Sequence, residues 1–590
     1  MTTTQAASGA KESPAVAADG RRLAMLWLTA CVALAGVVVV AGRFGPLDGL
    51  IHMNFAHQDL PAAVLGWGLL LGGGALAARF SGAAERAVPS GPRAVALLAA
   101  AAAAIAYAGA HLVFERHPLS MDEYMAVFDA AVFRTGRPAA EVAPEWRAYV
   151  PALQPLFRLE APGHAWWASA YLPVNAATRA LFDRLGDGAL AGPFWAGLSV
   201  LMVYAVGRRL RPERPAYALA AAALLATSAQ VLITAMTPFA MSAHLALNLL
   251  WLWLLLRGGA VGHLGAIGVA FAATGLHQLV FHPLFAAPFV LRLWLQRRWA
   301  PAAAHTAAYL AIGLFWTAYW RLALPTPPAF AGATPGGVLE HGLALILTFN
   351  PVDVTEMGAN LFRFTVWQNP LVIPLLLLAA AGMRRRREGV ELALWGGLIL
   401  TVAAMALILP YQGNGWGYRY LHGLVGSACL LAAAGWLEAV DAVAEPVRRR
   451  AWGLFVLVGL GSALVLLPLR AWQAKSFVSP YAAASRAIAR TDADVVLVDD
   501  RGAWFGSDLV RNDPFLRNRP VVMHLTALKP EQVLELCRTR KVVMFDALDA
   551  RRFGVRTDHD AKSAPACPPV TAAAARAPVD WRRGLRRAAS

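Results

Sequence analysis

Apolar runs of about 20 residues recur along this chain from residue 23 to residue 470, and they restrict its fold more than any other feature. A run of this length crosses the hydrocarbon core of a bilayer as an α-helix, in which every backbone N–H and C=O is paired. Because 58% of the residues are hydrophobic and only 15% are charged, no soluble fold could keep its surface polar. The sequence therefore predicts an α-helical polytopic membrane protein with about thirteen transmembrane helices. The predicted spans are residues 23–42, 60–78, 94–114, 190–206, 216–235, 239–256, 264–281, 284–296, 302–322, 366–383, 390–409, 421–441 and 452–470.

Arginines are distributed asymmetrically at the ends of these spans. With the N-terminus in the cytoplasm, nineteen arginines flank the spans on the cytoplasmic side, whereas the short loops on the opposite side contain only Arg43 and Arg419. Because positively charged loops stay in the cytoplasm, we expect loops 115–188, 323–365 and 410–420 and the C-terminal tail to share the outer face. The net charge of +17 then reflects topology, so the lipid bilayer is a predicted partner and nucleic acid is not.

Composition divides the chain into four parts. The first residues are rich in Ala, Thr, Ser and Gly, which predicts a disordered cytoplasmic tail. After the last span, short β-branched runs and one helical pattern predict a small extracytoplasmic α/β domain with a flexible end. The predicted parts are the tail 1–22, a two-span N-terminal extension 23–93, a transmembrane core 94–470 whose first large outer loop is 115–188, and the α/β domain 471–590. The strands of that domain are predicted at 494–500, 519–525 and 541–547, with a helix at 530–540.

The four cysteines fall into two pairs of different character. Cys31 and Cys429 lie in apolar spans, whereas Cys537 and Cys567 lie in the polar C-terminal part. No CxxC motif or His/Cys cluster is present, so no metal cofactor is predicted. Since the C-terminal domain is placed in an oxidising compartment, we predict a disulfide between Cys537 and Cys567; a buried thiol beside an unpaired one is the alternative.

The polar stretch 117–124 directly follows the third predicted span and contains two adjacent carboxylates, Asp122 and Glu123. A carboxylate at the boundary between bilayer and water can be partly desolvated and still meet both a lipid-borne and a soluble substrate. The stretch therefore indicates the active site of a membrane enzyme. The alternative is a solvated helix N-terminus, with Ser120 as its N-cap.

Three features together resemble one enzyme family. A Ser-x-Asp-Glu motif at 120–123 lies just past a span, the stretch 171–210 (YLPVNAATRALFDRLGDGALAGPFWAGLSVLMVYAVGRRL) contains a juxtamembrane helix that ends at Gly186, and Gly-Tyr-Arg-Tyr stands at 417–420 before a late span. This pattern resembles the C-type (GT-C) glycosyltransferase superfamily, in particular the branch of protein O-mannosyltransferases and lipid A aminoarabinose transferases. The resemblance covers roughly residues 94–470.

The resemblance implies an inverting glycosyltransferase. Such enzymes take a sugar from a polyprenyl-phosphate donor and transfer it to a cell-envelope acceptor, which is a glycan, a lipid or a protein, on the outer face of the bacterial cytoplasmic membrane. The chain departs from many relatives at 236–238, where Met-Thr-Pro offers no acid. A second carboxylate or a divalent metal is therefore unsupported.

Direct displacement needs a base for the acceptor and positive charge for the leaving phosphate. Asp122 is the predicted general base. Because adjacent side chains on a helix or strand point in different directions, Glu123 is not expected to act as an equivalent partner, but to orient the surroundings of Asp122 or to pair with a basic group. Arg419 is the predicted phosphate ligand, with an ordinary aromatic belt and one snorkelling arginine as the alternative. Tyr420, His277 and His282 are added to the predicted phosphate site, although a helix-packing hydrogen bond would also explain the two histidines.

Aromatic and basic residues of the outer loops are candidates for substrate binding, since aromatic rings stack on sugar faces. The alternative is that most of them anchor helices at the membrane interface. The predicted substrate-binding residues are Tyr124, Arg158, His164, Trp416 and Tyr418.

Two other classes of protein remain as alternatives. A transporter or lipid flippase also has many spans with isolated polar residues, but the sequence indicates neither an internal repeat nor paired broken helices. An O-antigen ligase or polymerase type of enzyme also uses polyprenyl-linked sugars, but it lacks an acidic pair immediately after a span.

Overall fold

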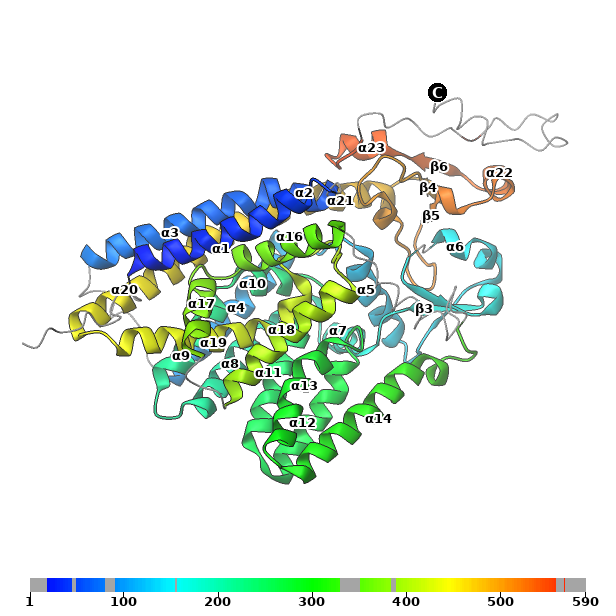
Figure 1. Ribbon diagram of the computed structural model, residues 1–590. Coiled ribbons are helices and arrows are strands. Elements are labelled where there is room, and N and C mark those ends of the chain that lie inside the picture. The colour runs from blue at the N-terminus through cyan, green and yellow to red at the C-terminus, as the bar shows by residue number, and fades with distance from the viewer. Residues whose placement is uncertain are drawn as a thin grey trace, which may run out of the picture.

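The structure is a computed structural model, which describes residues 19–44, 49–79, 91–153, 156–328, 351–383, 389–558 and Cys567 (Figure 1). Residues 1–18 of the predicted tail and the predicted flexible end after residue 558, apart from Cys567, lie outside the described residues.

Helices of membrane-spanning length dominate the described part of the chain. Seven helical stretches there are long and apolar enough to cross a membrane, or nine if two bent pairs are counted as one span each. The prediction of an α-helical polytopic membrane protein is therefore confirmed, whereas the number thirteen stays a prediction. The seven stretches are α1 (Gly20–Ala41), Gly49–Arg79 with α3 (Leu60–Arg79), α4 (Pro92–Leu112), Gly188–Leu210 with α8 (Ala191–Leu210), α18 (Val390–Ile408), Arg419–Asp441 with α19 (Val425–Asp441) and Glu445–Ala489. Shorter apolar helices are α11 (Met241–Arg257), α12 (Gly259–Thr274) and α13 (Phe281–Leu295), and α14 (Trp299–Ala323) follows them.

The span predicted at 216–235 is broken. Helices α9 (Pro215–Ala226) and α10 (Ala229–Ala235) meet at an angle of 56°. The side chain of Ser228 accepts a hydrogen bond from the N–H of Val231, so it caps a new helix at the point where one continuous helix was predicted.

The span predicted at 366–383 is the second half of another bent pair. Helices α16 (Pro351–Trp367) and α17 (Val372–Met383) are bent by 105°. Pro370 lies in the break and has no N–H to continue the helix, and the side chain of Asn369 accepts a bond from the N–H of Leu371 instead.

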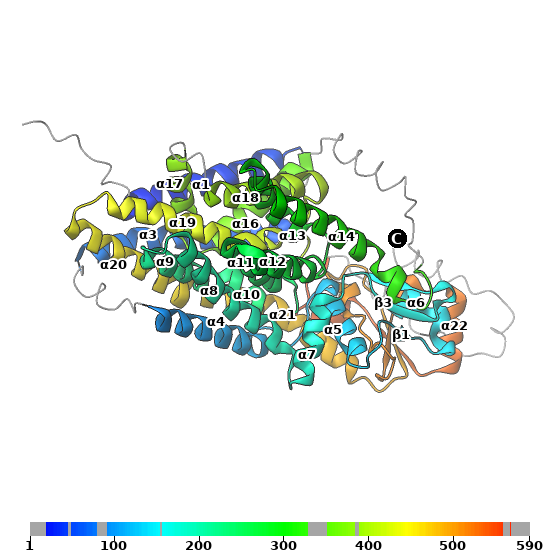
Figure 2. The same cartoon turned by 90° about the horizontal axis from the view of Figure 1, so that it is seen from below.

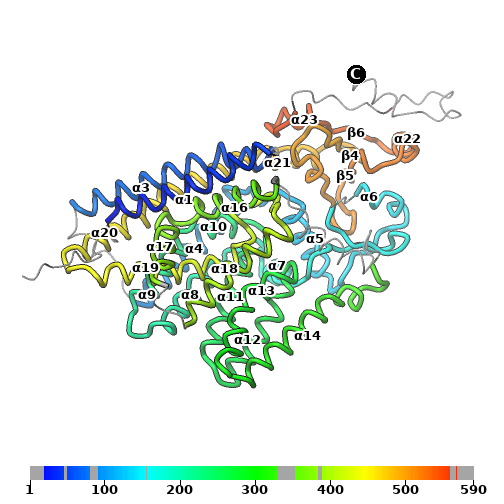
Figure 3. The backbone as a smooth tube through the Cα atoms, in the orientation of Figure 1, coloured from blue at the N-terminus to red at the C-terminus, as the bar shows by residue number. Residues whose placement is uncertain are grey.

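The predicted N-terminal extension packs along the core. Helix α1 packs against α3 and α16, and α3 packs against α20 (Glu445–Gly461), so these elements run side by side in Figure 1. The helical stretch that begins with α20 continues through α21 (Leu467–Ala489). The helix thus continues past residue 470, the predicted end of the transmembrane core, to residue 489, and Phe477, Val478 and Tyr481 of α21 pack in the main hydrophobic core (Figure 3).

The C-terminal domain is a small parallel sheet with two helices. Strands β4 (Val495–Val498), β5 (Val521–His524) and β6 (Val542–Phe545) have the order β5-β4-β6, and α22 (Pro530–Thr539) connects β5 to β6. Helix α23 (Ala547–Arg552) follows β6. The three predicted strands and the helix between the last two are thus present.

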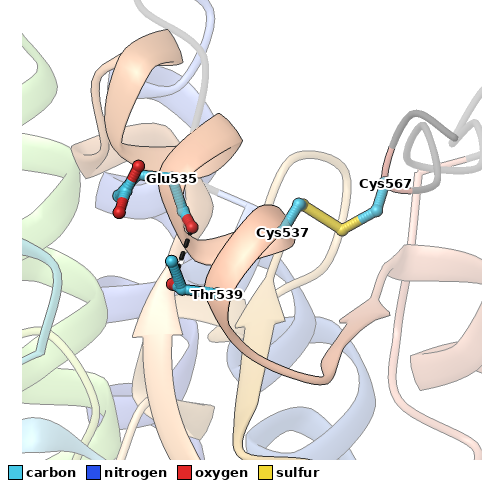
Figure 4. The surroundings of a disulfide bond; sticks show 4 residues. All are labelled: Glu535, Cys537, Thr539 and Cys567. Carbon is cyan, nitrogen blue, oxygen red and sulfur yellow. Dashed lines mark hydrogen bonds between the residues drawn. A yellow bond between two sulfur atoms is a disulfide. The ribbon is translucent and has the colours of Figure 1, made fainter. Parts of the chain in front are cut away.

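Helix α22 also carries one half of a disulfide. Cys537 is bonded to Cys567, as predicted (Figure 4). The hydroxyl of Thr539 donates to the backbone oxygen of Glu535 over 2.8 Å in the last turn of the same helix.

Segment 115–188, predicted as the first large outer loop with juxtamembrane helices, contains short strands as well as helices. It contains α5 (Met121–Phe133) and a three-stranded antiparallel sheet of order β1-β3-β2. Its strands are β1 (Ala140–Glu141), β2 (Arg158–Glu160) and β3 (Trp166–Ser169), which are too short to give a sequence pattern. Helix α7 (Val174–Arg184) lies against α5 and is followed by Gly186, whose φ of 129° favours glycine.

The first loop and the C-terminal domain share one hydrophobic core. Met125 and Phe128 of α5 and Trp167 of β3 belong to the same buried cluster as Val495 and Leu497 of β4. Figures 1 and 2 both place the two sheets at the same end of the molecule. The C-terminal domain therefore supports the loop that carries the acidic pair.

Candidate active site

Asp122 and Arg419 form an ion pair. Asp122 lies in the first turn of α5, and Arg419 begins the short 3₁₀ helix η6 (Arg419–Leu424), 297 residues later. Nη1 of Arg419 donates to Oδ2 of Asp122 over 2.7 Å, and the two side chains are 10% and 13% exposed. The structure thus joins the predicted base and the predicted phosphate ligand in one nearly buried, charge-assisted contact.

A tyrosine and a histidine complete the surroundings of Asp122. The hydroxyl of Tyr171 donates to Oδ1 of Asp122, and the ring of His277 lies 4.1 Å from the ring of Tyr171. Burial by itself would raise the pKa of Asp122, but Arg419, His277 and the Tyr171 bond hold that pKa below its ordinary value. Asp122 is therefore a carboxylate at neutral pH and can accept a proton.

The loop before η6 fixes the backbone of Arg419. The N–H of Arg419 donates to Oε1 of Gln412 over 2.9 Å, and Nε2 of Gln412 donates back to the oxygen of Gly417. Gly417 has a φ of 81°, and a Cβ atom there would lie 2.4 Å from Oε1 of Gln230, so only glycine fits. The guanidinium lies over the ring of Tyr420, and its Nε has no hydrogen-bond partner among the described residues.

Glu123 has a structural position at the start of α5. Its carboxylate accepts from the N–H groups of Ser120 and Leu119, it is fully buried, and burial raises its pKa to about 7. Ser120 is the N-cap residue, as in the alternative interpretation of this stretch, but its hydroxyl has no partner in the described part of the chain. Asp508 of the C-terminal domain accepts from the N–H of Met121 over 2.6 Å. Glu123 therefore caps the start of the helix that carries Asp122.

Two small pockets adjoin the ion pair. We call the first the Asp122 pocket and the second the Arg419 pocket, and each has room for about one water molecule. Asp122 contributes to one and Arg419 to the other, so the pair connects them. The Asp122 pocket is lined by Asp122, Met125, Ala126, Asp129, Ser169, Tyr171, Leu172, Asn175, Ala176, Phe239, Ala240, Leu276 and His277, and the Arg419 pocket by Met241, His244, Asn248, Phe281, Arg419, Tyr420, Gly423 and Leu424.

Four of the predicted site residues meet here, although not all in the predicted place. Arg419 and Tyr420 line the Arg419 pocket, whereas Asp122 and His277 line the Asp122 pocket, so His277 lies apart from the predicted phosphate ligand. His282 is completely buried and bonds to Asn248 and Tyr309, so it supports the wall of the Arg419 pocket from behind.

The predicted substrate-binding residues line neither pocket. The hydroxyl of Tyr124 donates to the backbone oxygen of Asn512 in the C-terminal domain. Arg158 and His164 both contact Glu160 at the edge of the small sheet. Trp416 and Tyr418 are buried in the helical core, where they pack against other aromatic rings.

Sequence reasoning missed Asp129, Asn248 and Gln412. Asp129 follows Asp122 by seven residues, which is two helical turns, so its position on the same face of α5 could have been recognised. Asn248 follows His244 by one turn on α11 and could also have been found. Gln412 lies in an irregular loop, where no sequence pattern marks it.

The described residues contain no group of three or more His, Cys, Asp or Glu side chains that could hold a metal ion.

Comparisons with known proteins give matches in structure only. No family model and no curated protein sequence matches this chain. The fold is similar to the crystal structure of ArnT from Cupriavidus metallidurans in the apo state, with a TM-score of 0.44 and 12% identity over 76% of this chain and 92% of that chain. It is also similar to the same protein bound to undecaprenyl phosphate, with a TM-score of 0.46 and 11% identity over 78% and 94% of the two chains. Because both TM-scores are below 0.5, neither structure is used to assign roles to the residues of this site.

Proposed function

We propose that this protein is an inverting GT-C type glycosyltransferase that moves a sugar from a polyprenyl-phosphate donor to a cell-envelope acceptor. The observation that carries the proposal is the ion pair of Asp122 and Arg419 between two pockets. A proton acceptor and a phosphate ligand in contact are the two groups that a direct displacement at the anomeric carbon requires.

In this proposal, the donor and the acceptor bind at different pockets. The donor phosphate lies beside Arg419, whose unpartnered Nε and buried neighbours His244 and Asn248 supply hydrogen-bonding groups. The acceptor hydroxyl lies beside Asp122. As its oxygen bonds to the anomeric carbon, the bond from that carbon to the phosphate oxygen breaks, the electron pair leaves with the phosphate, and the hydroxyl proton passes to Asp122.

Binding of the donor also changes the base. In the free protein Arg419 is held by Asp122, and this contact helps to keep the pKa of Asp122 low. A phosphate that draws Arg419 toward itself weakens the contact, and the pKa of Asp122 then rises. The carboxylate thus becomes a stronger base only when the donor is in place.

We further propose that the site faces the outer side of the bacterial cytoplasmic membrane, with the N-terminus in the cytoplasm. The arginine distribution supports this orientation. A reporter that is active only in the periplasm should be active in intact cells when it is fused to the C-terminus. If instead a fused reporter that works only in the cytoplasm is active, the proposed orientation is wrong.

The experiment that tests the enzymatic proposal supplies purified protein with radiolabelled polyprenyl-phosphate sugars and an envelope fraction. The expected result is label in envelope material together with free polyprenyl phosphate. Undecaprenyl phosphate, the ligand in one of the similar structures, is the probe for donor-side binding. Label that crosses a vesicle membrane without a change of chemical form would instead indicate a transporter.

A further inference from the structure

The two breaks in the membrane helices lie against each other. Thr227 and Ser228 separate α9 from α10, and Gln368 and Asn369 lie in the break between α16 and α17. Nδ2 of Asn369 donates to the hydroxyl oxygen of Thr227 over 2.8 Å, and the hydroxyl of Ser228 donates to Oε1 of Gln368 over 2.8 Å. Polar side chains are costly within a bilayer unless they are paired, and here the side chains of each break pair with those of the other.

A third irregularity meets the two breaks. The π-helical segment η7 (Ser462–Leu466) interrupts the long helical stretch between α20 and α21, and the hydroxyl of Ser462 donates to the backbone oxygen of Thr227 over 2.7 Å. Segments of π-helix inside an α-helix are rare and frequently lie at functional sites. Helix α10 packs against both α16 and η7, so three helical stretches that are far apart in the sequence are irregular at one place. We call the residues at this place the helix junction: Thr227, Ser228, Gln368, Asn369 and Ser462.

Gln230 connects the helix junction to the loop that carries Arg419. It lies in the first turn of α10 and is completely buried. Its Oε1 accepts from Nε2 of Gln368 over 2.8 Å, and its own Nε2 donates to the backbone oxygen of Tyr418 over 2.8 Å. Because a carbonyl can only accept, the Tyr418 oxygen fixes which way both amides point. A continuous row of hydrogen bonds therefore runs from Ser228 to the residue directly before Arg419.

Thr234 holds the same loop from the next turn of α10. Its hydroxyl donates to the backbone oxygen of Trp416 over 3.2 Å. Gln230 and Thr234 are four residues apart, so they share one face of the helix. That face is turned toward the loop because α10 departs from α9 by 56°. The backbone at 416–418 is thus held by two side chains that the break directs at it, and Gly417 leaves room for Gln230 between them.

The destination of these two bonds sets them apart from ordinary pairing of polar groups between membrane helices. Such pairing requires only that amides and hydroxyls find partners, as the side chains of the helix junction do among themselves. Gln230 and Thr234 instead donate to the backbone of the loop of Arg419. Gln412 holds the N–H of Arg419 from within that loop, so the two α10 residues add a second hold from the helical core.

We propose that Gln230 and Thr234 are positioning residues, which hold the backbone at 416–418 so that the guanidinium of Arg419 faces Asp122 and the donor phosphate. This inference rests on the proposed function, in which Arg419 binds that phosphate, and it adds two residues that line neither pocket. The three irregular helices then have a common effect, because the helix junction keeps Gln230 in place.

Two substitutions remove the proposed holds, and a third is their matched control. Gln230→Met removes the donor to Tyr418 at similar size, Thr234→Val removes the donor to Trp416, and Ser462→Ala removes a bond that stays within the helix junction. Titration with undecaprenyl phosphate should show an affinity about three- to tenfold lower for Gln230→Met, the effect of one lost hydrogen bond. Thr234→Val should have a smaller effect because its bond is longer, and Ser462→Ala should bind like the wild type.

Combination with Arg419→Ala distinguishes positioning from a general loss of stability. If Gln230 acts through Arg419, the double variant should bind undecaprenyl phosphate no more weakly than Arg419→Ala alone. A general loss would lower the affinity by the same factor in both backgrounds. In transfer assays, Gln230→Met should raise the half-saturating concentration of the labelled lipid and leave that of the envelope fraction unchanged.

Equal affinities of Gln230→Met and Ser462→Ala would overturn the inference, and so would additive effects of Gln230→Met and Arg419→Ala. Where Gln230→Met fails to fold, the same cycle with Thr234→Val decides. If Arg419→Ala binds the lipid like the wild type, Arg419 is not the phosphate ligand, and the proposed function fails together with the inference. If Arg419→Ala binds weakly and Gln230→Met does not, only the inference fails.

Discussion

Two buried clusters of Asp and Arg lie in the described part of this molecule, and they differ in what surrounds them. Asp122 and Arg419 border two pockets, and each keeps at least a tenth of its side chain exposed. Asp59, Arg363 and Arg470 line neither pocket, and none of their side chains is more than 4% exposed. Both clusters are thus buried ion pairs, but only the pair of Asp122 and Arg419 borders the two pockets described above.

The enclosed cluster joins distant parts of the fold. Asp59, from the N-terminal extension, accepts from Arg363 of α16 over 3.0 Å and from Arg470 of α21 over 3.1 Å, and the indole of Trp367 donates to it as well. Arg363 also donates to the backbone oxygen of Gly415, in the loop that leads to Arg419. The enclosed cluster therefore helps to hold the loop that carries the phosphate ligand.

This comparison shows that a buried ion pair is not by itself a sign of catalysis. A buried pair serves structure when its groups are consumed by fixed partners. A buried pair can take part in a reaction when a substrate can reach it and bind one of the two charged groups in place of the other.

The largest effect is expected in the enclosed cluster. Asp59→Ala leaves two guanidinium groups buried without their anion, so the free energy of unfolding should fall by about 3 to 5 kcal/mol. Thermal unfolding of the detergent-solubilised protein, followed by tryptophan fluorescence, measures the loss. Asp122→Asn is the control at the other cluster and should unfold near the wild-type temperature; an equal loss in both variants would remove the distinction.

A smaller effect, confined to binding, is expected for Arg419→Ala. Loss of a hydrogen bond from a charged donor to the phosphate should weaken undecaprenyl phosphate binding by about 10- to 100-fold. Arg419→Lys should recover part of it, because the charge remains but the planar fork is lost. Equal affinities of wild type and Arg419→Ala, measured by lipid titration, would place the phosphate elsewhere.

The smallest effect is expected at the contact between the C-terminal domain and α5. Asp508→Leu removes the acceptor for the N–H of Met121 and should destabilise the protein by about 0.5 to 2 kcal/mol, the range for a lost helix cap. Transfer should fall with it because the first turn of α5 positions Asp122. Asp508→Asn keeps an acceptor oxygen and should lie between wild type and Asp508→Leu in both measurements.

The sequence predicted the helices and strands that are marked by a continuous run of apolar or β-branched residues. Apolar runs predicted the helical membrane architecture, and short β-branched runs predicted β4, β5 and β6. It failed where single residues break a regular pattern, at Ser228 and at Pro370, because a capping hydroxyl or a missing N–H does not change mean hydropathy.

The candidate site was predictable to a similar extent. Asp122 and Arg419 could be found because each is unusual for its place, an acid just beyond a span and an arginine on the side that otherwise avoids it. The predicted substrate-binding aromatics lie elsewhere, since aromatic rings at an interface serve packing as well as recognition. Asp129 was overlooked although its spacing from Asp122 marks it, and the clusters themselves depend on contacts between residues hundreds of positions apart.

The most direct test of the central claim is the transfer rate of Asp122→Asn protein, measured together with its affinity for undecaprenyl phosphate. Asn keeps the size of the side chain but cannot take the acceptor proton, so transfer should fall by a factor on the order of 10² to 10⁴. The affinity for the lipid phosphate should stay the same or increase, because Arg419 is released from its anionic partner. A purified Asp122→Asn protein that transfers sugar at a near wild-type rate would contradict the account, and the base would then have to be another residue.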